Sequence, residues 1–292
     1  MKKITTYALL VASILLSACV QEIPVSVDHD INAEVGALET TFESKTLYCN
    51  LTDATALDMQ KVAEYLTEQN ADVVTFLSDD SNFEAWLQTY AEANEYNYLV
   101  QSISSSTTIV GCLSKGAIAT FADSFNNAII TAPVLHFAVE GIHYVVTELK
   151  EGGLVMADGS HNPDELYNDT RKAQVENIIS TTIDNSAYFS ADKWLFTIDM
   201  NSTSTLDISQ YGKSDVLAEN CVANDVMIYN GLVDCIAVNN NYYQASSTDR
   251  SRHNFLYTTV KSWQMMQPVV IDKTSTMGVA HYPIMVTLKS EE

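Results

Sequence analysis

Residues 45–80, KTLYCNLTDATALDMQKVAEYLTEQNADVVTFLSDD, decide the fold that the sequence predicts. Their two ends, TLYCNL and VVTFL, are short apolar runs with the length of buried strands. Between these runs, the segment Thr55–Gln69 carries apolar residues at helical spacing: Met59, Val62, Ala63 and Leu66. Thr52 or Asp53 is available as the helix cap. A strand, a helix and a strand at this spacing are typical of a crossover unit.

The rest of the chain alternates strand-like runs with further helical segments. Helices are expected over Ser81–Asn94 and Asp164–Thr182. Residues 107–150 contain four apolar runs separated by short polar turns, which is typical of antiparallel strands. Five more strand-like runs follow: WLFTIDMN, GLVDCIAV, HNFLYTT, PVVID and HYPIMVTL. Many strands with helices between them favour two packed sheets with helices outside.

The N-terminal segment has the features of an export signal. Lys2 and Lys3 precede an apolar run that is too short for a membrane span, and small residues then lead to Cys19. The ending Leu16-Ser17-Ala18-Cys19 resembles a bacterial lipobox. We therefore predict a lipoprotein signal peptide over residues 1–18. A simple secretory signal that happens to contain Cys19 is the alternative.

This signal sets the expected domain organisation and location. A lipidated Cys19 would begin an acidic tether over residues 19–44, and one domain would occupy residues 45–292. No glycine- or proline-rich boundary divides that domain. We expect an outer-membrane lipoprotein of the cell envelope, facing either the periplasm or the exterior, whose membrane partner is reached through the lipid anchor.

The chain is strongly acidic, with a formal net charge of −22. Nucleic-acid binding depends on lysines and arginines that displace counterions from phosphates. Nucleic acid is therefore not expected as a partner. Solubility of a tethered protein is a sufficient alternative reason for the charge.

The remaining cysteines show no metal-binding spacing. Cys49, Cys112, Cys221 and Cys235 form neither a CxxC pair nor a cysteine–histidine set of the kind that binds zinc. Three of them lie in apolar strand-like runs, where a free cysteine usually acts as a small buried hydrophobe. A bridge between Cys221 and Cys235 remains open for an extracytoplasmic protein.

Polar residues recur where the predicted strands begin or end. Asn50 ends the first strand, Asp79 follows the second, and Asp199 and Asn201 end the run WLFTIDMN. His281 precedes the last strand. Polar residues at the ends of buried apolar strands tend to gather at one rim of a sheet sandwich, where binding sites form. We therefore expect a site at that rim.

The order of these residues resembles that of the endonuclease/exonuclease/phosphatase superfamily, the DNase I-like fold, across roughly residues 45–290. Members typically carry an asparagine on the first strand, a glutamate on the next, a Thr-His pair, an Asp-x-Asn, an Arg-x-Asp-Tyr-like strand and a final Ser-Asp-His. Other landmarks match as well: Leu149-Lys150, Arg171, Asp234 and Arg252–Tyr257. The resemblance implies an α+β fold, a four-layer α/β/β/α sandwich of two mixed β-sheets flanked by helices.

The resemblance also implies a chemistry. In that family a divalent metal, usually magnesium, is held by the glutamate and neighbouring oxygen ligands. The Asp-x-Asn pair orients water and phosphate, and the histidines handle protons. Four candidate catalytic residues occupy matching positions here: Asn50, Asp199, Asn201 and His281. Asp79 and Glu148 are the candidate ligands for magnesium or manganese.

Four positions depart from the family pattern. Asp79 is one methylene shorter than the family's glutamate, and Glu148 replaces the imidazole of the Thr-His pair. Asn254 and Ala280 replace two aspartates, so His281 resembles a catalytic histidine without its orienting acid. Loss of that acid costs about 10⁴ in rate in the serine-protease template. A carboxylate at 148 would also repel a phosphate oxyanion, by about 1–4 kcal/mol at 4 Å.

These departures favour a degenerate site. The predicted function is a ligand-binding or pseudoenzyme module with a small phosphorylated or glycan ligand. The alternative is a metal-dependent phosphoesterase, a phosphodiesterase or phosphatase, in which Glu148 serves as a base or a replacement metal ligand.

Each candidate residue also has a purely structural explanation. Asn50 could cap a strand end, and the acids after the second strand could cap the following helix. Asp199 and Asn201 could be turn residues, although a carboxylate ending so apolar a strand needs partners. Glu148 could be a solvated charge. His281 could be bonded to a backbone carbonyl.

Overall fold

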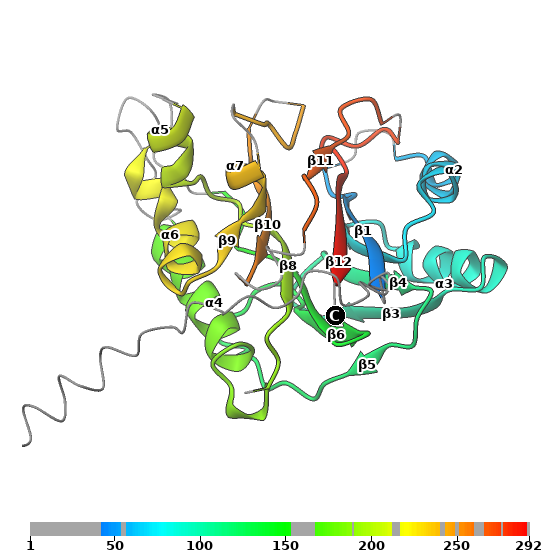
Figure 1. Cartoon of the computed structure of the whole chain (residues 1–292), viewed down its shortest axis with the longest axis horizontal. Helices are drawn as coiled ribbons and strands as arrows, with labels where there is room; N and C mark the ends of the chain where they lie inside the picture. Colours follow the sequence, from blue (N-terminus) through cyan, green and yellow to red (C-terminus); the bar gives the residue numbers. More distant parts are fainter. Residues whose placement is uncertain are drawn as a thin grey trace, which may run out of the picture. The chain divides into compact units, whose positions relative to one another are not determined.

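Two six-stranded sheets form the centre of the molecule (Figure 1). The structure is a computed structural model and describes residues 42–53, 57–152, 167–188, 190–211, 217–239, 243–248, 251–259, 266–275 and 277–290. Each sheet is mixed, and helices pack on its outer side. The predicted α+β sandwich is confirmed.

The first sheet contains the predicted crossover unit. Its strand order is β11-β12-β1-β2-β4-β3. The crossover connects the parallel strands β1 and β2 through α2, and the other pairs are antiparallel. The elements are β1 (Phe42–Asn50), α2 (Met59–Gln69), β2 (Val73–Ser78), β3 (Asn97–Ser102), β4 (Ile109–Ser114), β11 (Val270–Ile271) and β12 (Ile284–Ser290).

The second sheet contains another parallel pair. Its order is β5-β6-β7-β8-β10-β9, with β7 and β8 parallel and the other pairs antiparallel. Helix α4 lies between β7 and β8 in the sequence. The elements are β5 (Ala119–Thr120), β6 (Leu135–Val139), β7 (Ile142–Glu148), α4 (Asn168–Thr181), β8 (Trp194–Asp199), β9 (Val233–Asp234) and β10 (Asn254–Thr258).

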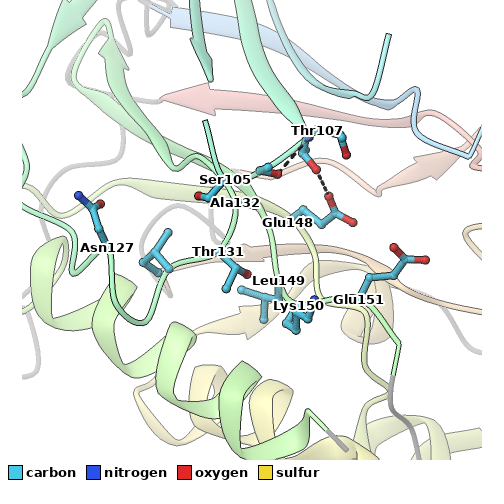
Figure 2. Close-up of a pocket in the computed structure, with 12 residues that line it drawn as sticks. Ser105, Thr107, Asn127, Thr131, Ala132, Glu148, Leu149, Lys150 and Glu151 are labelled. Carbon is cyan, nitrogen blue, oxygen red and sulfur yellow. Dashed lines mark hydrogen bonds between the residues drawn. The ribbon is translucent and has the colours of Figure 1, made fainter. Parts of the chain in front are cut away.

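Strand pairing lines up polar residues at one edge of the sandwich. In the second sheet Asp199 is aligned with Glu148 on β7 and with Asn254 on β10. Aligned residues of adjacent strands point to the same face of a sheet. Asn50 approaches this face from the end of β1. Figure 2 shows Glu148 at the end of β7, opposite the loop that carries Thr107.

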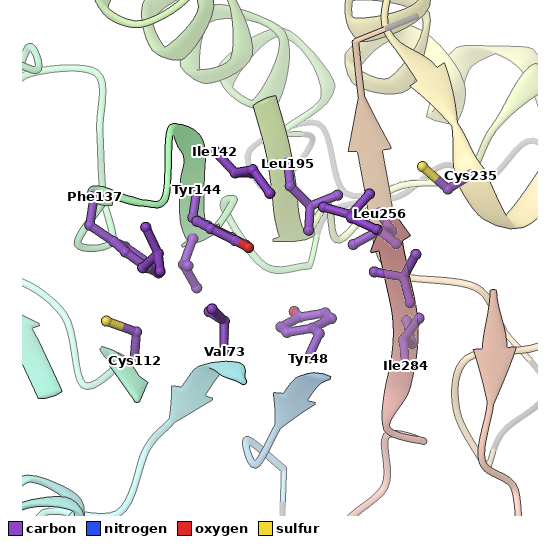
Figure 3. Close-up of a cluster of buried hydrophobic side chains, with 14 of the residues drawn as sticks. Tyr48, Val73, Cys112, Phe137, Ile142, Tyr144, Leu195, Cys235, Leu256 and Ile284 are labelled. Carbon is purple, nitrogen blue, oxygen red and sulfur yellow. The ribbon is translucent and has the colours of Figure 1, made fainter. Parts of the chain in front are cut away.

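Apolar side chains fill the three spaces between the four layers. Between the sheets, Tyr48 and Val73 lie on the first sheet, and Tyr144, Leu195 and Leu256 lie on the second (Figure 3). A second cluster joins the first sheet to α2 and α3 (Phe83–Ala93). A third joins the second sheet to α4 and α6 (Val222–Tyr229). The site residues therefore project from a rigid, packed support.

Short helical elements complete the described chain. They are η2 (Ser186–Tyr188), α5 (Thr205–Tyr211), η3 (Ala218–Cys221) and α7 (Cys235–Asn239). Among the described helices, none combines the length and the apolar character that crossing a membrane requires.

Strand β1 overlaps the end of the predicted tether. β1 begins at Phe42, within the stretch predicted as tether, because residues 42–48 pair with β12. An ion pair of 3.2 Å between Glu43 and Lys289 joins the two strands. The predicted signal peptide, Cys19 and most of the tether lie outside the described residues.

Several element boundaries also differ from the sequence prediction. Helix α2 begins at Met59, because Asp58 accepts hydrogen bonds from the first backbone N–H groups as its N-cap. Residues 235–239, predicted as strand, form α7, and Asp234 accepts from the Ala237 N–H in its first turn. Strand β3 was not predicted. The four described cysteines are buried and free, so Cys221 and Cys235 are not bridged.

Candidate functional site

The polar side chains at this edge form one hydrogen-bonded network. Asn50 and Asp199 are each 2% exposed, and Asn50 Nδ2 donates to Asp199 Oδ2 at 2.7 Å. The backbone N–H of Thr52 donates to Asn50 Oδ1 at 3.0 Å. A backbone N–H can only donate and a carboxylate can only accept. The orientation of the Asn50 amide is therefore fixed from both sides.

Asn201 connects Asp199 to the neighbouring strand end. Its backbone N–H donates to Asp199 Oδ1 at 3.0 Å, which forms a tight turn directly after β8. Its Nδ2 donates to Glu148 Oε1 at 3.1 Å. Its φ of 44° lies in the left-handed region, which asparagine tolerates better than most residues. The predicted pair, Asp199 and Asn201, thus lies in the network. The two residues also form a turn, which was the purely structural explanation considered for them.

Glu148 is bonded to this network and also lines a pocket, which Figure 2 shows. Its Oε2 accepts a 2.6 Å hydrogen bond from the Thr108 hydroxyl. The pocket has a volume of about 450 Å³, and hydroxyl-bearing residues of the loop before β4 form much of its wall. Burial, and after it the Asp199 carboxylate, raises the pKa of Glu148 to about 7, although its two hydrogen bonds lower it. Glu148 is therefore a partly buried group that exchanges a proton near neutral pH.

Asn254 extends the network toward the last strand. It is fully buried, and its Oδ1 accepts from Asn50 Nδ2 at 2.8 Å and from the Tyr48 hydroxyl at 2.9 Å. Burial raises the pKa of Tyr48 well above its usual value, so the hydroxyl keeps its proton. Because Oδ1 receives two donors, Nδ2 of Asn254 is the atom that faces His281 Nδ1, at 2.8 Å.

This contact fixes the tautomer of His281. Nδ1 accepts a hydrogen bond and carries no proton, so the proton of the neutral ring is on Nε2. In hydrolases whose carboxylate accepts from Nδ1–H, Nε2 is instead the free base. The orienting group of His281 is therefore not lost, as the sequence suggested. It is replaced by an amide with the opposite hydrogen-bonding polarity.

His281 lines a second pocket, of about 310 Å³. The side chain is 7% exposed, and Nε2 has no hydrogen-bond partner in the described part of the chain. Asp53 Oδ2 lies 3.6 Å away, which is too far for a hydrogen bond. Asp53 has φ 56°, so two residues of this pocket, Asp53 and Asn201, hold the left-handed conformation that often marks functional sites.

Solved structures share this architecture. An AP endonuclease from Archaeoglobus fulgidus matches with a TM-score of 0.63 and 13% identity, over 84% of this chain and 99% of that chain. A 3′–5′ exonuclease from Neisseria meningitidis matches with a TM-score of 0.61 and 12% identity, over 84% and 100% of the two chains. The chain has the DNase I-like fold. No protein-family model and no curated protein sequence matches it.

A third DNase I-like structure extends the comparison. The endonuclease domain of a telomere-specific non-LTR retrotransposon matches with a TM-score of 0.53 and 11% identity, over 86% of this chain and 100% of that domain. The predicted resemblance is thus confirmed at the level of the fold. At such low identity the site chemistry has to be argued from the residues of this chain.

Asp79, a predicted metal ligand, lies outside the hydrogen-bonded network. β2 ends at Ser78, whose side chain is fully buried, and Asp79 follows with an exposed side chain. Among the described residues, no hydrogen bond or ion pair joins Asp79 to the network. Asp80 Oδ1 accepts a hydrogen bond from the Asn82 N–H at the start of α3. This agrees with the structural explanation that an acid after the second strand caps the following helix.

The carboxylates of the network are already hydrogen-bonded where the resemblance implies a magnesium or manganese site. Both oxygens of Asp199 accept hydrogen bonds from Asn50 and Asn201, and both oxygens of Glu148 are likewise bonded. Magnesium in proteins is commonly held by one or two carboxylates and keeps several waters. Across the residues that the structure describes, no group of three acidic, histidine or cysteine side chains could hold a metal ion.

Arg252, which was predicted only as a landmark of the resemblance, lies in a buried cluster of charges. It forms buried ion pairs with Asp207 at 2.6 Å and Asp234 at 2.7 Å, and all three side chains are at most 1% exposed. Its guanidinium lies 4.3 Å from the centroid of the Phe255 ring. Since β10 begins two residues later, these contacts hold the strand that presents Asn254.

A separate cluster contains histidines to which the sequence analysis gave no function. His136 Nδ1 lies 2.5 Å from Asp123, and His136 Nε2 lies 2.9 Å from His143 Nδ1. Tyr188 also donates to Asp123, and Phe121 stacks on both imidazoles. Burial, and after it His136, lowers the pKa of His143 to about 4. The hydrogen-bonded partners are 7 to 65 positions apart in the sequence, so their spacing did not predict this cluster.

Proposed function

We propose that this chain is a ligand-binding module that retains the DNase I-like rim without the hydrolysis typical of its relatives. The observation that carries the proposal is the hydrogen bond from Asn254 Nδ2 to His281 Nδ1. Nε2 then carries the ring proton and has no free lone pair. His281 therefore cannot accept a proton from an attacking water at this nitrogen. The ligand is a small phosphorylated compound or a glycan, held at the pockets beside Glu148 and His281.

Two further features support binding without hydrolysis. Each carboxylate oxygen of the network already accepts one amide or hydroxyl hydrogen bond, with which a cation would have to compete. Glu148, where the family pattern has an imidazole, carries negative charge above pH about 7. A phosphate oxyanion in a transition state would be repelled there rather than stabilised.

Glu148 also favours a second candidate function, a phosphoesterase with a rearranged site. A carboxyl group with a pKa of about 7 suits general base catalysis at neutral pH. It lines a pocket, and its position beside Asn201 would let it take the proton that His281 cannot accept. In this candidate, replacing Glu148 would abolish turnover.

Hydrolysis measurements separate the two candidates. The test uses bis(p-nitrophenyl) phosphate and p-nitrophenyl phosphate with added magnesium or manganese, and compares the wild type with Asp199→Ala and its milder control Asp199→Asn. We expect the same background rate for all three proteins, because the missing base assistance alone is worth about 10²–10⁴ in rate. Metal-dependent turnover by the wild type that Asp199→Ala removes would support the phosphoesterase and overturn the binding module.

We further propose that Cys19 is lipidated and anchors the protein to the cell envelope as an outer-membrane lipoprotein. Leu16-Ser17-Ala18-Cys19 and the preceding apolar run support this. In a bacterial host fed with an alkyne fatty acid, the wild type should carry the label and enter the detergent phase. Cys19→Ala should do neither, and the matched neighbour Ser17→Ala should behave as wild type. Equal labelling of Cys19→Ala would contradict the anchor.

A further inference from the structure

The pocket beside His281 offers a defined set of hydrogen-bonding groups. His281 Nε2–H is a buried donor without a hydrogen-bond partner in the described part of the chain. Two carboxylates, Asp53 and Glu151, belong to the same pocket, together with the hydroxyl-bearing Thr248. The ligand must therefore accept one hydrogen bond at His281 and donate others to carboxylates.

This combination excludes the main charged ligands. A phosphate would accept from His281 but would be repelled by Asp53 and Glu151 and by the overall charge of −22. A metal cation at Nε2 would need the ring proton on Nδ1, where it would face the donor Nδ2 of Asn254. An ammonium group would suit the carboxylates, but it has no acceptor for Nε2–H.

A hydroxyl group meets both requirements, because it donates and accepts at the same oxygen. The 3.6 Å separation between His281 Nε2 and Asp53 Oδ2 is too long for a direct hydrogen bond. Both atoms can instead form hydrogen bonds to the same ligand hydroxyl group. A ligand with several neutral hydroxyl groups could then use Glu151 and Thr248 in the same way.

We infer that this pocket binds a neutral saccharide, with one sugar hydroxyl accepting from His281 Nε2 and donating to Asp53. The inference rests on the proposed binding function and chooses between the two ligand classes that the sequence left open. The tautomer with the proton on Nε2 suits this ligand, because the protonated Nε2 can donate a hydrogen bond to a sugar oxygen.

Saturation-transfer NMR on the full chain tests the saccharide. The probes are glucose, galactose, mannose, xylose, cellobiose and lactose, with glucose 6-phosphate as the charged analogue. We expect saturation transfer to at least one neutral sugar, and weaker binding of the phosphate. If none of the neutral sugars binds, or if glucose 6-phosphate binds more tightly than glucose, the inference is wrong.

Substitutions locate the binding. Asp53→Asn changes an exposed side chain and should weaken the best sugar about tenfold, the usual effect of one lost hydrogen bond to a charged group. Asp184→Asn, an exposed aspartate that belongs to neither pocket described above, should leave affinity unchanged. Equal affinity in Asp53→Asn would overturn the assignment. Metal-dependent phosphoester turnover would instead overturn the proposed function itself, whatever the sugar result.

Discussion

Arg252→Met is expected to lower the free energy of unfolding by about 3–5 kcal/mol, the usual cost of removing one partner from a buried ion pair. Arg252 is the shared counter-charge of two carboxylates, Asp207 and Asp234, and the side chains of both are at most 1% exposed. Methionine preserves much of the side-chain volume but leaves both carboxylates buried without a counter-charge. Urea denaturation at neutral pH measures the loss.

A triple variant separates charge from packing. In Arg252→Met combined with Asp207→Asn and Asp234→Asn, no buried charge remains, so much of the lost stability should return. The deficit of the single variant should also shrink at acidic pH, where the stranded carboxylates take up protons. A single-variant loss of about 1 kcal/mol or less, the range of exposed ion pairs, would contradict the buried triad.

Glu148→Gln is expected to remove a pH dependence of stability worth about 3 kcal/mol. Burial raises the pKa of Glu148 from 4.5 to about 7, so the folded chain keeps a proton that the unfolded chain has already lost in this interval. The protonated carboxyl therefore stabilises the fold fully below pH about 4.5. This stabilisation declines as the pH rises and is lost above about 7.

Glutamine can reproduce both hydrogen bonds of the neutral carboxyl group, to Asn201 and to the rotatable Thr108 hydroxyl. Relative to the wild type, Glu148→Gln should thus gain about 3 kcal/mol in unfolding free energy between pH 4 and pH 8. Glu84→Gln, an exposed glutamate on α3, should show no such change. A constant difference between Glu148→Gln and the wild type across this range would show that Glu148 has an ordinary environment.

The overall architecture was accessible from the sequence because it depends on local patterns. The crossover from β1 through α2 to β2 follows from two apolar runs and one amphipathic helix. The polar ends of the strands then had to meet at one edge, and Asn50, Asp199 and His281 do meet there through Asn254.

Boundaries and short elements were harder, because single side chains set them. Thr52 or Asp53 was the predicted cap of α2, whereas the hydrogen bonds of Asp58 set its start at Met59. The run GLVDCIAV is apolar enough for a strand, but Asp234 accepts from the Ala237 N–H and starts α7 instead. Short apolar runs do not distinguish a buried helix from a strand.

The chemistry of the site depended on orientations that a sequence does not contain. Asn254 was visible as a replacement for aspartate, but the direction of its amide follows from Thr52, Asn50 and Tyr48. Asp79 matched the family pattern by order, although β2 ends one residue earlier and leaves its side chain exposed. The order of polar residues in the sequence therefore predicted where the rim lies. The direction of the hydrogen bonds at Asn254 and His281 could be read only from the structure.

The protonation state of His281 is the most direct test of this account. In protein labelled with ¹⁵N-histidine, long-range ¹H–¹⁵N correlation spectra distinguish a protonated from an unprotonated ring nitrogen, and His281→Gln assigns the signals. Asn254→Asp is the matched control, because its carboxylate must accept from Nδ1–H and should reverse the tautomer. At neutral pH we expect wild-type His281 to have an unprotonated Nδ1 and a protonated Nε2. A protonated Nδ1 with a free Nε2 would restore the catalytic base and contradict the account.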